Sequence, residues 1–339
     1  MRVLLSGYYG FDNAGDEAIL MAIVHELKSL GHDVSVLSQK PDETSQIHRV
    51  QAFHRMRPMD VLRALTHCDV LFSGGGGLLQ DKTSHRNLTY YLGIIRVARF
   101  LRKRVVIFNQ SLGPLSPKGK TAVAHVLSRT DNWVRDRNSQ GFLKELGVLA
   151  RLGGDPALLL TPSAGLQVHA NRVIFAPRSG EPECSMRLAQ AARSLAEEGK
   201  EIVVLGLQPH EDAVECQRIA QACSAQVVLS PNPREVLDLI AGSGFVVGVR
   251  LHAVILAAAA RIPFVGVAYD PKVEGFCADA KAPSFPLDFD PKDIVSAVLA
   301  QDRFDPLAVS EMVGRARASF TQALSVNSKQ KTAALEEAT

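Results

Sequence analysis

The chain has 339 residues, of which 46% are hydrophobic and 22% charged, a composition that excludes disordered and collagen-like proteins and predicts two domains of ordinary size. Lys and Arg number 38 against 35 Asp and Glu, so the formal net charge of +3 is too small to indicate nucleic-acid binding. The longest apolar stretch, residues 245–260, contains Arg250 and His252 and falls short of the roughly 20 apolar residues that span a bilayer.

The opening residues predict a first strand and contain neither the apolar region nor the cleavage site of a signal peptide. We therefore expect a cytoplasmic protein. The five cysteines form no CxxC pair, which favours reduced thiols over a disulfide framework or a zinc site. We expect no bound metal.

In the first half, short apolar runs alternate with helical periodicity, the pattern of βα units around a parallel sheet. We predict strands at residues 3–6, 34–37, 70–73 and 105–109, and a weaker one near Trp133. Helices are predicted at residues 16–30, 59–66, 88–101, 118–128 and 139–146. The periodicity is lost over residues 153–170, which predicts the crossing between two domains.

The same alternation restarts after this crossing. We predict strands at residues 173–176, 202–205, 226–229, 245–248 and 264–268. Helices are predicted at residues 186–198, 212–222, 234–241, 252–260, 294–300 and 310–324, and the polar residues at the end are expected to fray. The chain is thus divided into residues 1–160, residues 161–305 and a C-terminal helix with a polar tail at 306–339, with ligands expected at the carboxyl ends of the strands.

Two glycine-rich loops follow predicted strands. Residues 7–17 present backbone N–H groups to a helix N-terminus and could hold an anion, but they match neither GxGxxG nor a Walker loop, which disfavours NAD and ATP. Asn13 and Asp16 could equally cap the helix, whereas capping does not explain Asp12. Residues 74–77 are four glycines in succession, which favours a loop that a ligand approaches closely, with a hinge or a tight domain contact as the alternative.

Three arginines directly follow apolar runs: Arg135, Arg178 and Arg250. A guanidinium at the end of a buried strand needs an anionic partner, and its planar fork fits a carboxylate or a phosphate. An internal salt bridge, such as Arg135 with Asp136 or Asp155, would explain any one of them. Three together favour an anionic ligand.

His252 lies beside Arg250, where a strand ends and a helix of small residues begins. The helix N-terminus lowers the pKa of this imidazole and a bound anion raises it, so it is suited to exchange a proton near neutrality. Lys272 adds a cation at the same edge, or is a solvated surface lysine. The cluster of His210, Glu211 and Asp212 could contact a sugar or nucleotide, or simply cap a helix.

Five motifs occur in this order: the loop of residues 7–18, the glycine run up to Gln80-Asp81, Arg135-Asp136, Arg250-Leu251-His252 and Tyr269-Asp270-Pro271-Lys272. In them the sequence resembles the polysaccharide pyruvyltransferase family over residues 1–300, most closely the bacterial cell-wall members whose pyruvylated polymer anchors S-layer proteins. The resemblance implies two Rossmann-like domains with parallel sheets, arranged as in glycosyltransferases of the B type, with the active site in the interdomain cleft.

The resemblance also implies a reaction, in which the pyruvyl group of phosphoenolpyruvate is transferred to a sugar as a cyclic ketal. The Arg-Leu-His motif of the family binds phosphoenolpyruvate, so Arg250, Leu251 and His252 inherit that role, and Lys272 and Arg135 match further family cations. We add Arg178 to this set of phosphoenolpyruvate-binding residues. Binding of phosphoenolpyruvate is assigned mainly to the C-terminal domain, residues 161–305. For the cell-wall members the acceptor is N-acetylmannosamine in a polyprenyl-diphosphate-linked disaccharide, and the product is a 4,6-ketal.

We predict that His252 handles the proton at the phosphoenolpyruvate end and that Asp12 or Asp16 deprotonates the sugar hydroxyl. The N-terminal domain is assigned to the acceptor, through Tyr8, Gly10, Asn13, Gly75, Gly76, Gln80 and Asp81. No cofactor beyond the co-substrate phosphoenolpyruvate and no nucleic-acid partner are expected, and an oligomer is compatible with the sequence.

A lipid-linked acceptor would bring the protein to the inner face of the cell membrane, and the basic residues Arg99, Arg102, Lys103 and Arg104 could assist there or merely be a solvated helix end. Two other functions stay open. One is a nucleotide-sugar glycosyltransferase, because two tandem α/β domains with Arg and His at the cleft also suit a nucleoside diphosphate. The other is a non-catalytic anion-binding protein.

Overall fold

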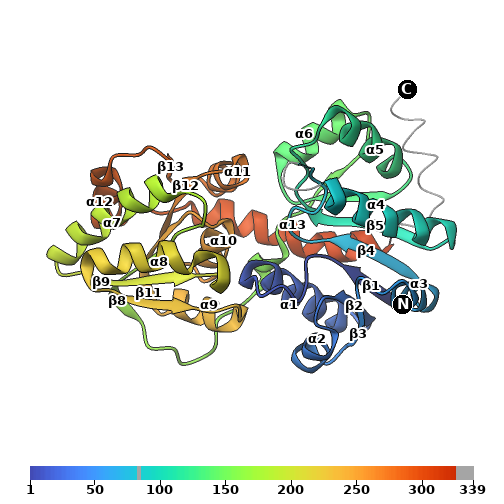
Figure 1. Ribbon diagram of the computed structural model, residues 1–339, viewed down its shortest axis with the longest axis horizontal. Coiled ribbons are helices and arrows are strands. Elements are labelled where there is room, and N and C mark those ends of the chain that lie inside the picture. Colours follow the sequence, from blue (N-terminus) through green and yellow to red (C-terminus); the bar gives the residue numbers. More distant parts are fainter. Residues whose placement is uncertain (82–84, 326–339) are drawn as a thin grey trace.

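The computed structural model describes residues 1–81 and 85–325, and its buried apolar runs form two separate sheets (Figure 1). The first sheet contains β1 (Arg2–Ser6), β2 (Asp33–Ser38), β3 (Gln51–His54), β4 (Val70–Gly74), β5 (Arg104–Gln110), β6 (Asp131–Val134) and β7 (Arg151–Leu152). Their spatial order is β3-β2-β1-β4-β5-β6-β7, with every neighbouring pair parallel.

The second sheet repeats this plan. It contains β8 (His169–Ala176), β9 (Glu201–Gly206), β10 (Gln226–Leu229), β11 (Ser243–Gly248), β12 (Phe264–Ala268) and β13 (Ser284–Pro286). The order is β10-β9-β8-β11-β12-β13, again parallel throughout. The strand order reverses beside β1 in the first sheet and beside β8 in the second, which is where α/β sheets bind ligands.

Helices connect the strands. The first domain holds α1 (Ala14–Ser29), α2 (Pro41–His48), α3 (Pro58–His67), α4 (His85–Phe100), α5 (Pro117–Leu127), α6 (Arg137–Glu145) and the short 3₁₀ helix η1 (Pro156–Leu159). The second holds α7 (Pro182–Glu197), α8 (Pro209–Cys223), α9 (Pro233–Ala241), α10 (Leu251–Ala259), α11 (Pro271–Ala280) and α12 (Pro291–Ala300), and α13 (Pro306–Ser325) ends the described chain. Nine of the α-helices in the described residues begin at a proline, whose fixed φ and missing N–H suit a first helical position.

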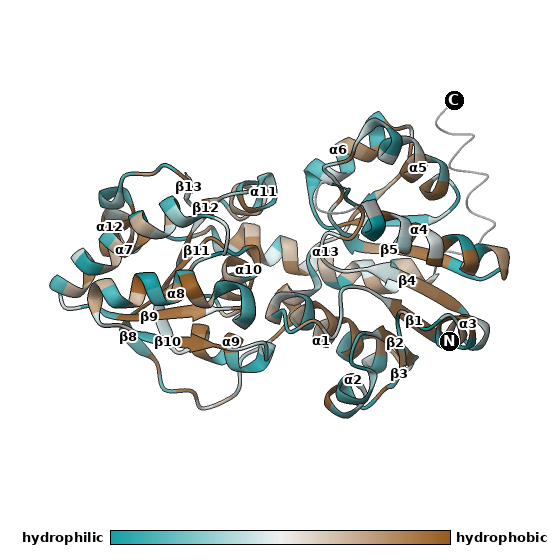
Figure 2. Ribbon diagram, in the orientation of Figure 1, coloured by the Kyte–Doolittle hydropathy of each residue, from teal (hydrophilic) through white to brown (hydrophobic). Residues whose placement is uncertain are grey.

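The two domains share an apolar interface. Helix α1 packs against α9 and α10 of the other domain, and one continuous core joins Ile19 and Ile23 to Leu237, Ile240 and Val254. Helix α13, red in Figure 1, runs from the second domain back to the first, where Phe320 packs edge-on against Phe108 of β5. Figure 2 shows the strands of both sheets in the hydrophobic colour, as expected for sheets covered by helices on both faces.

The predicted strands are confirmed to within about two residues, except that β8 begins four residues earlier than predicted, and most predicted helices agree equally well. The sequence analysis missed β3, β7, β13, α2 and α11. Strand β3 buries only Phe53 among its four residues, so it has no apolar run to recognise. The predicted fraying of the polar tail concerns residues 331–339, which lie outside the described chain. Among the described residues, none of the helices combines the length and apolar character needed to cross a membrane.

Candidate active site

The loop after β1 is held mostly by its own contacts. Asn13 is the N-cap of α1, and its side chain accepts a hydrogen bond from the Gly15 N–H at 3.0 Å. The Gly10 N–H, in a residue with φ of +79°, donates to Glu17 at 2.7 Å. Asn13 and Gly10 therefore shape the loop, as the capping alternative expected.

Asp12 and Asp16, the two aspartates of residues 7–17, face different cavities. Asp12 has φ of +56° and accepts hydrogen bonds from Lys40 Nζ at 2.7 and 2.9 Å. It lines a cavity of about 210 Å³ against the start of α9. Asp16 lines a larger cavity of about 530 Å³, next to the glycine run. Asp12 is thus engaged in an ion pair with Lys40, whereas Asp16 faces open space.

Each glycine after β4 makes room for another group. A Cβ on Gly74 would lie 2.0 Å from the Phe108 carbonyl oxygen, and one on Gly75 would lie 2.3 Å from Ile19. A Cβ on Gly76, where φ is +72°, would lie 2.6 Å from Asp16 Oδ1. One on Gly77 would lie 2.9 Å from Lys272 Nζ, which comes from the other domain. The run therefore provides a close domain contact at Gly77, as one of the two alternatives expected, and the same glycine lines the 530 Å³ cavity.

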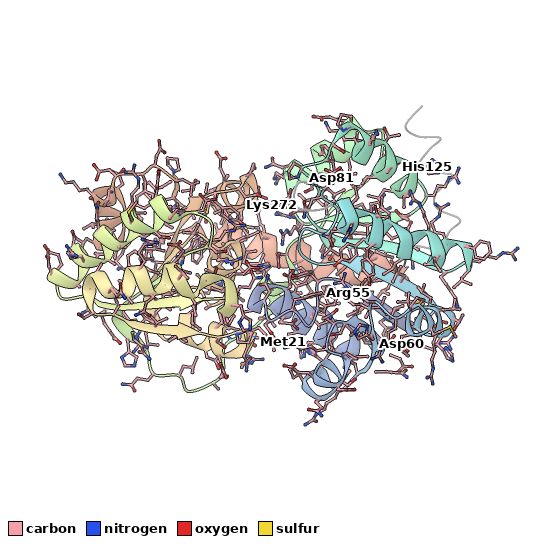
Figure 3. The ribbon with its side chains drawn as sticks, in the orientation of Figure 1. Met21, Arg55, Asp60, Asp81, His125 and Lys272 are labelled. Carbon is pink, nitrogen blue, oxygen red and sulfur yellow. The ribbon has the colours of Figure 1, made fainter. Side chains whose placement is uncertain are left out.

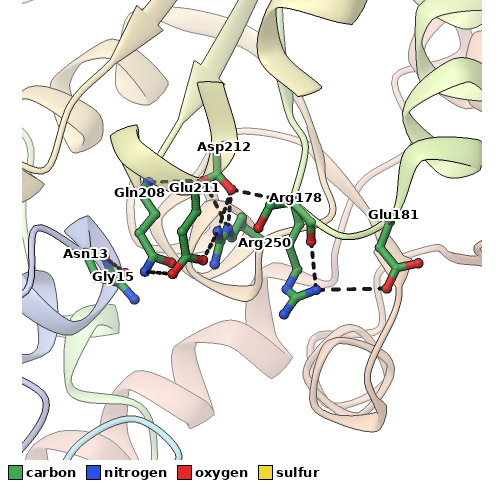
Figure 4. A network of polar contacts seen from close by, with 9 residues as sticks. Asn13, Gly15, Arg178, Glu181, Gln208, Glu211, Asp212 and Arg250 are labelled. Carbon is green, nitrogen blue, oxygen red and sulfur yellow. Dashed lines mark hydrogen bonds and ion pairs between the residues drawn. The ribbon is translucent and has the colours of Figure 1, made fainter. Parts of the chain in front are cut away.

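Arg250, the N-cap of α10, lies in a network of carboxylates (Figure 4). Its Nε lies 3.1 and 3.2 Å from the two Asp212 oxygens, and its Nη2 donates to Asp212 and lies 3.4 Å from Glu211. Asp212 is fully buried on α8 and also accepts from the backbone N–H groups of Ser179 and Gln208. The sequence left Glu211 and Asp212 open, and the structure shows that they orient Arg250, with its Nη1 making no hydrogen bond to a described residue.

Arg178 lies at the neighbouring strand end. Its guanidinium stacks over the Tyr269 ring at 4.3 Å from the ring centroid, and Nη1 donates to the Ser179 carbonyl and lies 3.9 Å from Glu181 (Figure 4). Its buried Nε has no hydrogen-bond partner among the described residues.

Arg135 and His252 meet at Asp155, which lies in the chain between the two sheets. Arg135 donates from Nη1 to Asp155 at 2.7 Å and from Nε to Ser111 at 2.6 Å. His252 Nε2 is buried 3.8 Å from the same Asp155 oxygen and makes no hydrogen bond to a described residue. The other side of the imidazole packs on Gly15, where a Cβ would lie 2.1 Å from Nδ1.

Lys272 completes the set at the start of α11, where Asp270 caps the helix by accepting from the Lys272 backbone N–H. Figure 3 shows this side chain facing the first domain. Within the described chain, Nζ makes neither a hydrogen bond nor an ion pair. A cavity of about 20 Å³, enough for one water molecule, is lined by Ser111, Arg135, Asp136, Asp155, Leu251 and Lys272 among others.

Burial and neighbouring charge shift the titration of these groups. Loss of solvent raises the pKa of Asp16 to about 7, with nearby Glu17 adding to the shift and Arg135 opposing it. Burial lowers the pKa of His252 to about 4, partly offset by Asp155. Burial and Arg135 also lower the pKa of Lys272. Arg135 and Arg250 both act on Asp16 and on His252, so these four side chains lie close to one another.

The acceptor-side residues divide into two groups. Tyr8 and Gln80 line the 530 Å³ cavity together with Gly77, which was not predicted, whereas Gly75 and Gly76 are not among its lining residues; Tyr8 is stacked on Phe11. Asp81 instead accepts from the backbone N–H and the hydroxyl of Ser116, which caps α5. Asp81 therefore stabilises the start of α5 and is not one of the residues that line the cavity.

The sequence analysis did not identify Arg55, which also lines this cavity. The residue is only 5% exposed, lies over the Tyr90 and Phe11 rings at 4.4 and 4.9 Å, and leaves its Nε without a partner among the described residues. Like the predicted arginines, it follows a strand end, but that strand is β3. Recognising residues 51–54 as a strand would have revealed it.

No group of His, Cys, Asp and Glu side chains within residues 1–81 and 85–325 is arranged to hold a metal ion. All five cysteines are free thiols, four of them buried.

Comparison with known proteins gives a family and a fold. A family model described as polysaccharide pyruvyl transferase matches residues 13–271. No curated protein matches the chain.

Among solved structures, the chain is similar to the UDP-N-acetylglucosamine 2-epimerase of Rickettsia bellii, with a TM-score of 0.60 and 10% identity over 96% of each chain. It is similar to the UDP-GlcNAc 2-epimerase of Neisseria meningitidis bound to UDP-GlcNAc, with a TM-score of 0.59 and 13% identity over 96% of this chain and 99% of that one. It is also similar to the ADP-heptose lps heptosyltransferase II of E. coli, with a TM-score of 0.53 and 13% identity over 89% of this chain and 98% of that one. These likenesses confirm the predicted glycosyltransferase-B-like pair of Rossmann-like domains.

Proposed function

The chain belongs to the polysaccharide pyruvyl transferase family, and from this premise we propose that it transfers the pyruvyl group of phosphoenolpyruvate to a glycan as a cyclic ketal, releasing phosphate. One observation carries the proposal. A small cavity lined by cations and a large cavity lined by Asp16 meet at the contact between Gly77 and Lys272. The cations assigned to the donor therefore adjoin the acceptor cavity across the domain contact, and the space of about 20 Å³ between them must widen to admit phosphoenolpyruvate.

The donor side holds several polar atoms that lack a partner among the described residues. They are the buried Arg178 Nε and His252 Nε2, together with Arg250 Nη1 and Lys272 Nζ. Buried polar atoms are normally hydrogen-bonded, so unpaired ones at a cleft indicate a ligand. Phosphoenolpyruvate carries a carboxylate and a phosphate, which match such a set of donors. We assign Leu251 and Arg135 to the wall of the same site.

The chemistry needs one protonation at carbon and two losses of hydroxyl protons. Protonation of the methylene carbon makes C2 electrophilic, and the first sugar hydroxyl adds there while losing its proton to a base. The bond from C2 to the phosphate oxygen then breaks, the second hydroxyl forms the new bond to C2, and its proton leaves with phosphate. The cations stabilise the charge that develops on the departing phosphate.

We assign His252 to the proton at the donor end and Asp16 to the base. The neutral His252 ring gains a proton more readily when an anionic donor binds beside it, because the anion opposes the effect of burial on its pKa. Asp16 faces the acceptor cavity and has a pKa of about 7, which suits a base that works near neutrality. Asp12 is the weaker choice because Lys40 pairs with it.

We propose that the acceptor is N-acetylmannosamine in a lipid-linked precursor of a secondary cell-wall polymer, that its 4,6-ketal is the product, and that the finished polymer anchors an S-layer. The sequence motifs support this choice of subtype. The 530 Å³ cavity supports a glycan in general, because the aromatic rings of Tyr8 and Tyr90 offer faces for a sugar and Arg55 offers a donor.

The test is incubation with phosphoenolpyruvate and a synthetic lipid-like disaccharide, followed by mass spectrometry and a phosphate assay. The proposal expects the pyruvyl mass gain together with stoichiometric phosphate. A nucleotide-sugar glycosyltransferase, which the fold likeness also allows, would instead consume a UDP-sugar and release UDP. Tight binding of phosphoenolpyruvate without turnover would indicate the anion-binding alternative.

A further inference from the structure

The outward sides of α3 and α4, with the turns at their ends, form an exposed surface that mixes apolar and basic side chains; we call it the α3–α4 surface. Its apolar members are Met56, Met59, Leu62, Val97 and Phe100. Met59 is 75% exposed and Phe100 is 86% exposed; Leu149 and Leu307 are similarly exposed, so it is the grouping of apolar side chains on one surface that indicates an interaction site.

These side chains belong to one surface because α3 and α4 are tied together at both ends. The Tyr90 hydroxyl on α4 donates to the Arg55 carbonyl just before α3, at 2.9 Å. Beyond the other end of α4, Lys103 Nζ donates to the carbonyls of Thr66 and Cys68 at 3.0 and 2.8 Å. Both helices also cover the same apolar core on one face of the first sheet.

The charge of the chain is concentrated in this segment. Residues 55–104 contain ten Lys and Arg but only three Asp, a formal charge of +7, which leaves −4 for the rest of a chain whose total is +3. Exposed basic residues on the surface are Arg57, Arg63, Arg96 and Arg102. Within the described chain, none of these four guanidinium groups is engaged in an ion pair. By contrast, Lys103 bonds to carbonyls and Arg104 pairs with Asp131, so two of the four basic residues that the sequence pointed to have structural roles.

We propose that the α3–α4 surface docks on an anionic lipid bilayer, with Met59 and Phe100 entering the headgroup region and the arginines contacting the lipid phosphates. Exposed apolar side chains between arginines fit both parts of such an interface. A second copy of the chain fits less well, because a two-fold contact would set arginines against arginines. This inference does not depend on the proposed reaction.

The surface also adjoins the large cavity. Met56 and Arg86 belong to its lining, and α3 and α4 both begin at that edge of the sheet. A bilayer on the α3–α4 surface would therefore lie beside the cavity mouth.

The experiment is co-sedimentation of the full chain with vesicles of phosphatidylcholine alone and of phosphatidylcholine with phosphatidylglycerol in equal amounts. We expect binding to the mixed vesicles, weakened by salt, and much less to the neutral ones. The double variant M59D/F100D should reduce the partition coefficient by about tenfold or more, because it removes apolar contact and adds like charge. Leu149→Asp, at an equally exposed leucine elsewhere in the same domain, should change nothing.

A second pair of variants separates charge from apolar contact. R63Q/R96Q should lower binding to the mixed vesicles by about fivefold for each arginine removed, while Arg129→Gln, at another exposed arginine of this domain, should not. The proposal fails if the wild-type protein binds neither vesicle type, or if M59D/F100D binds the mixed vesicles as strongly as the wild type does. It also fails if RNA binds at this surface instead, or if the same variants merely convert a dimer into monomers.

Discussion

At the scale of single residues, Asp16 and Asp12 show how position in the fold separates two similar carboxylates. Lys40 pairs with Asp12, whereas Asp16 lies beside the glycine run with a pKa raised to about 7 by burial. A base must be deprotonated to act. We therefore expect kcat/KM to rise with pH through about 7 and then level off, and Asp16→Asn to lose at least 100-fold in kcat. Steady-state phosphate release across pH measures both.

The raised pKa of Asp16 should also be detectable in the pH dependence of the free energy of unfolding. The folded chain holds a proton on Asp16 at pH values where the unfolded chain has lost it, so this carboxyl makes the free energy of unfolding fall as the pH rises from about 4 to 7. Burial also raises the pKa of neighbouring Glu17 to about 7, so Asp16→Asn should make the fall shallower without abolishing it, which urea unfolding at several pH values detects. A normal profile in Asp16→Asn would refute the assignment.

Asp155 carries the second prediction at this scale. It accepts from buried Arg135 and lies next to His252, and its other oxygen caps η1. Asp155→Asn keeps the cap but removes the charge, so it should destabilise the protein by about 3 kcal/mol and raise the KM for phosphoenolpyruvate. Glu201→Gln, in the exposed pair with Arg172, should cost less than about 1 kcal/mol. An Asp155→Asn protein as stable as wild type would show that Arg135 does not depend on this partner.

Sequence reasoning found the residue types of this site better than their partners. Arg135, Arg178 and Arg250 were predicted because each follows an apolar run. The ion pair of Arg135 with Asp155 was one of the alternatives that the sequence left open. That Asp212 holds Arg250 and that His252 lies beside Asp155 depends on contacts between residues far apart in the chain. No spacing rule contains that information.

At the scale of elements, the glycine run after β4 is the feature whose geometry most directly shapes the cavities. Gly76→Ala must accommodate a φ of +72° and a Cβ 2.6 Å from Asp16 Oδ1. We expect a loss of about 1–2 kcal/mol in stability and a fall of about 100-fold in kcat/KM, because the base is displaced by a fraction of an ångström or more. Urea unfolding and steady-state kinetics measure the two effects.

Gly165→Ala is the matched control for this variant. Gly165 has nearly the same φ, +74°, but a Cβ at this position would have no atom of the described residues within 4 Å beyond its chain neighbours. The Gly165→Ala variant should lose stability because of its backbone conformation but keep the kcat/KM of the wild type. Equal kinetic losses in both variants would mean that backbone strain, and not displacement of Asp16, explains the effect.

The elements were predictable where burial was complete and not where it was partial. Strands β4 and β11 are buried at nearly every position and were found from their apolar runs. Edge strand β3 and helix α2, whose only buried residue is Thr44, give no such signal. Missing β3 also hid Arg55, so an error at the scale of one element became an error at the site.

At the scale of the whole molecule, the two domains touch at the site itself. The Ala14 N–H at the start of α1 donates to the Leu207 carbonyl of the second domain at 2.9 Å, and the His252 ring occupies the space where Gly15 lacks a side chain. The first turn of α1 is therefore the contact that brings Asp16 and His252 into one site. Under the proposed mechanism, the packing of the two domains at this turn also sets the position of the base relative to the donor.

Gly15→Ala tests this link, since its Cβ would lie 2.1 Å from His252 Nδ1 and either the ring or the whole domain must move. We expect a larger radius of gyration by small-angle X-ray scattering and a fall of about 100-fold in kcat. Gly141→Ala, at a glycine of α6 with open space around it, should leave both unchanged and gain up to about 1 kcal/mol in helix stability. If the Gly15→Ala protein has the same radius of gyration and the same kcat as the wild type, then His252 tolerates displacement. The first turn of α1 would then not set the geometry of the reaction.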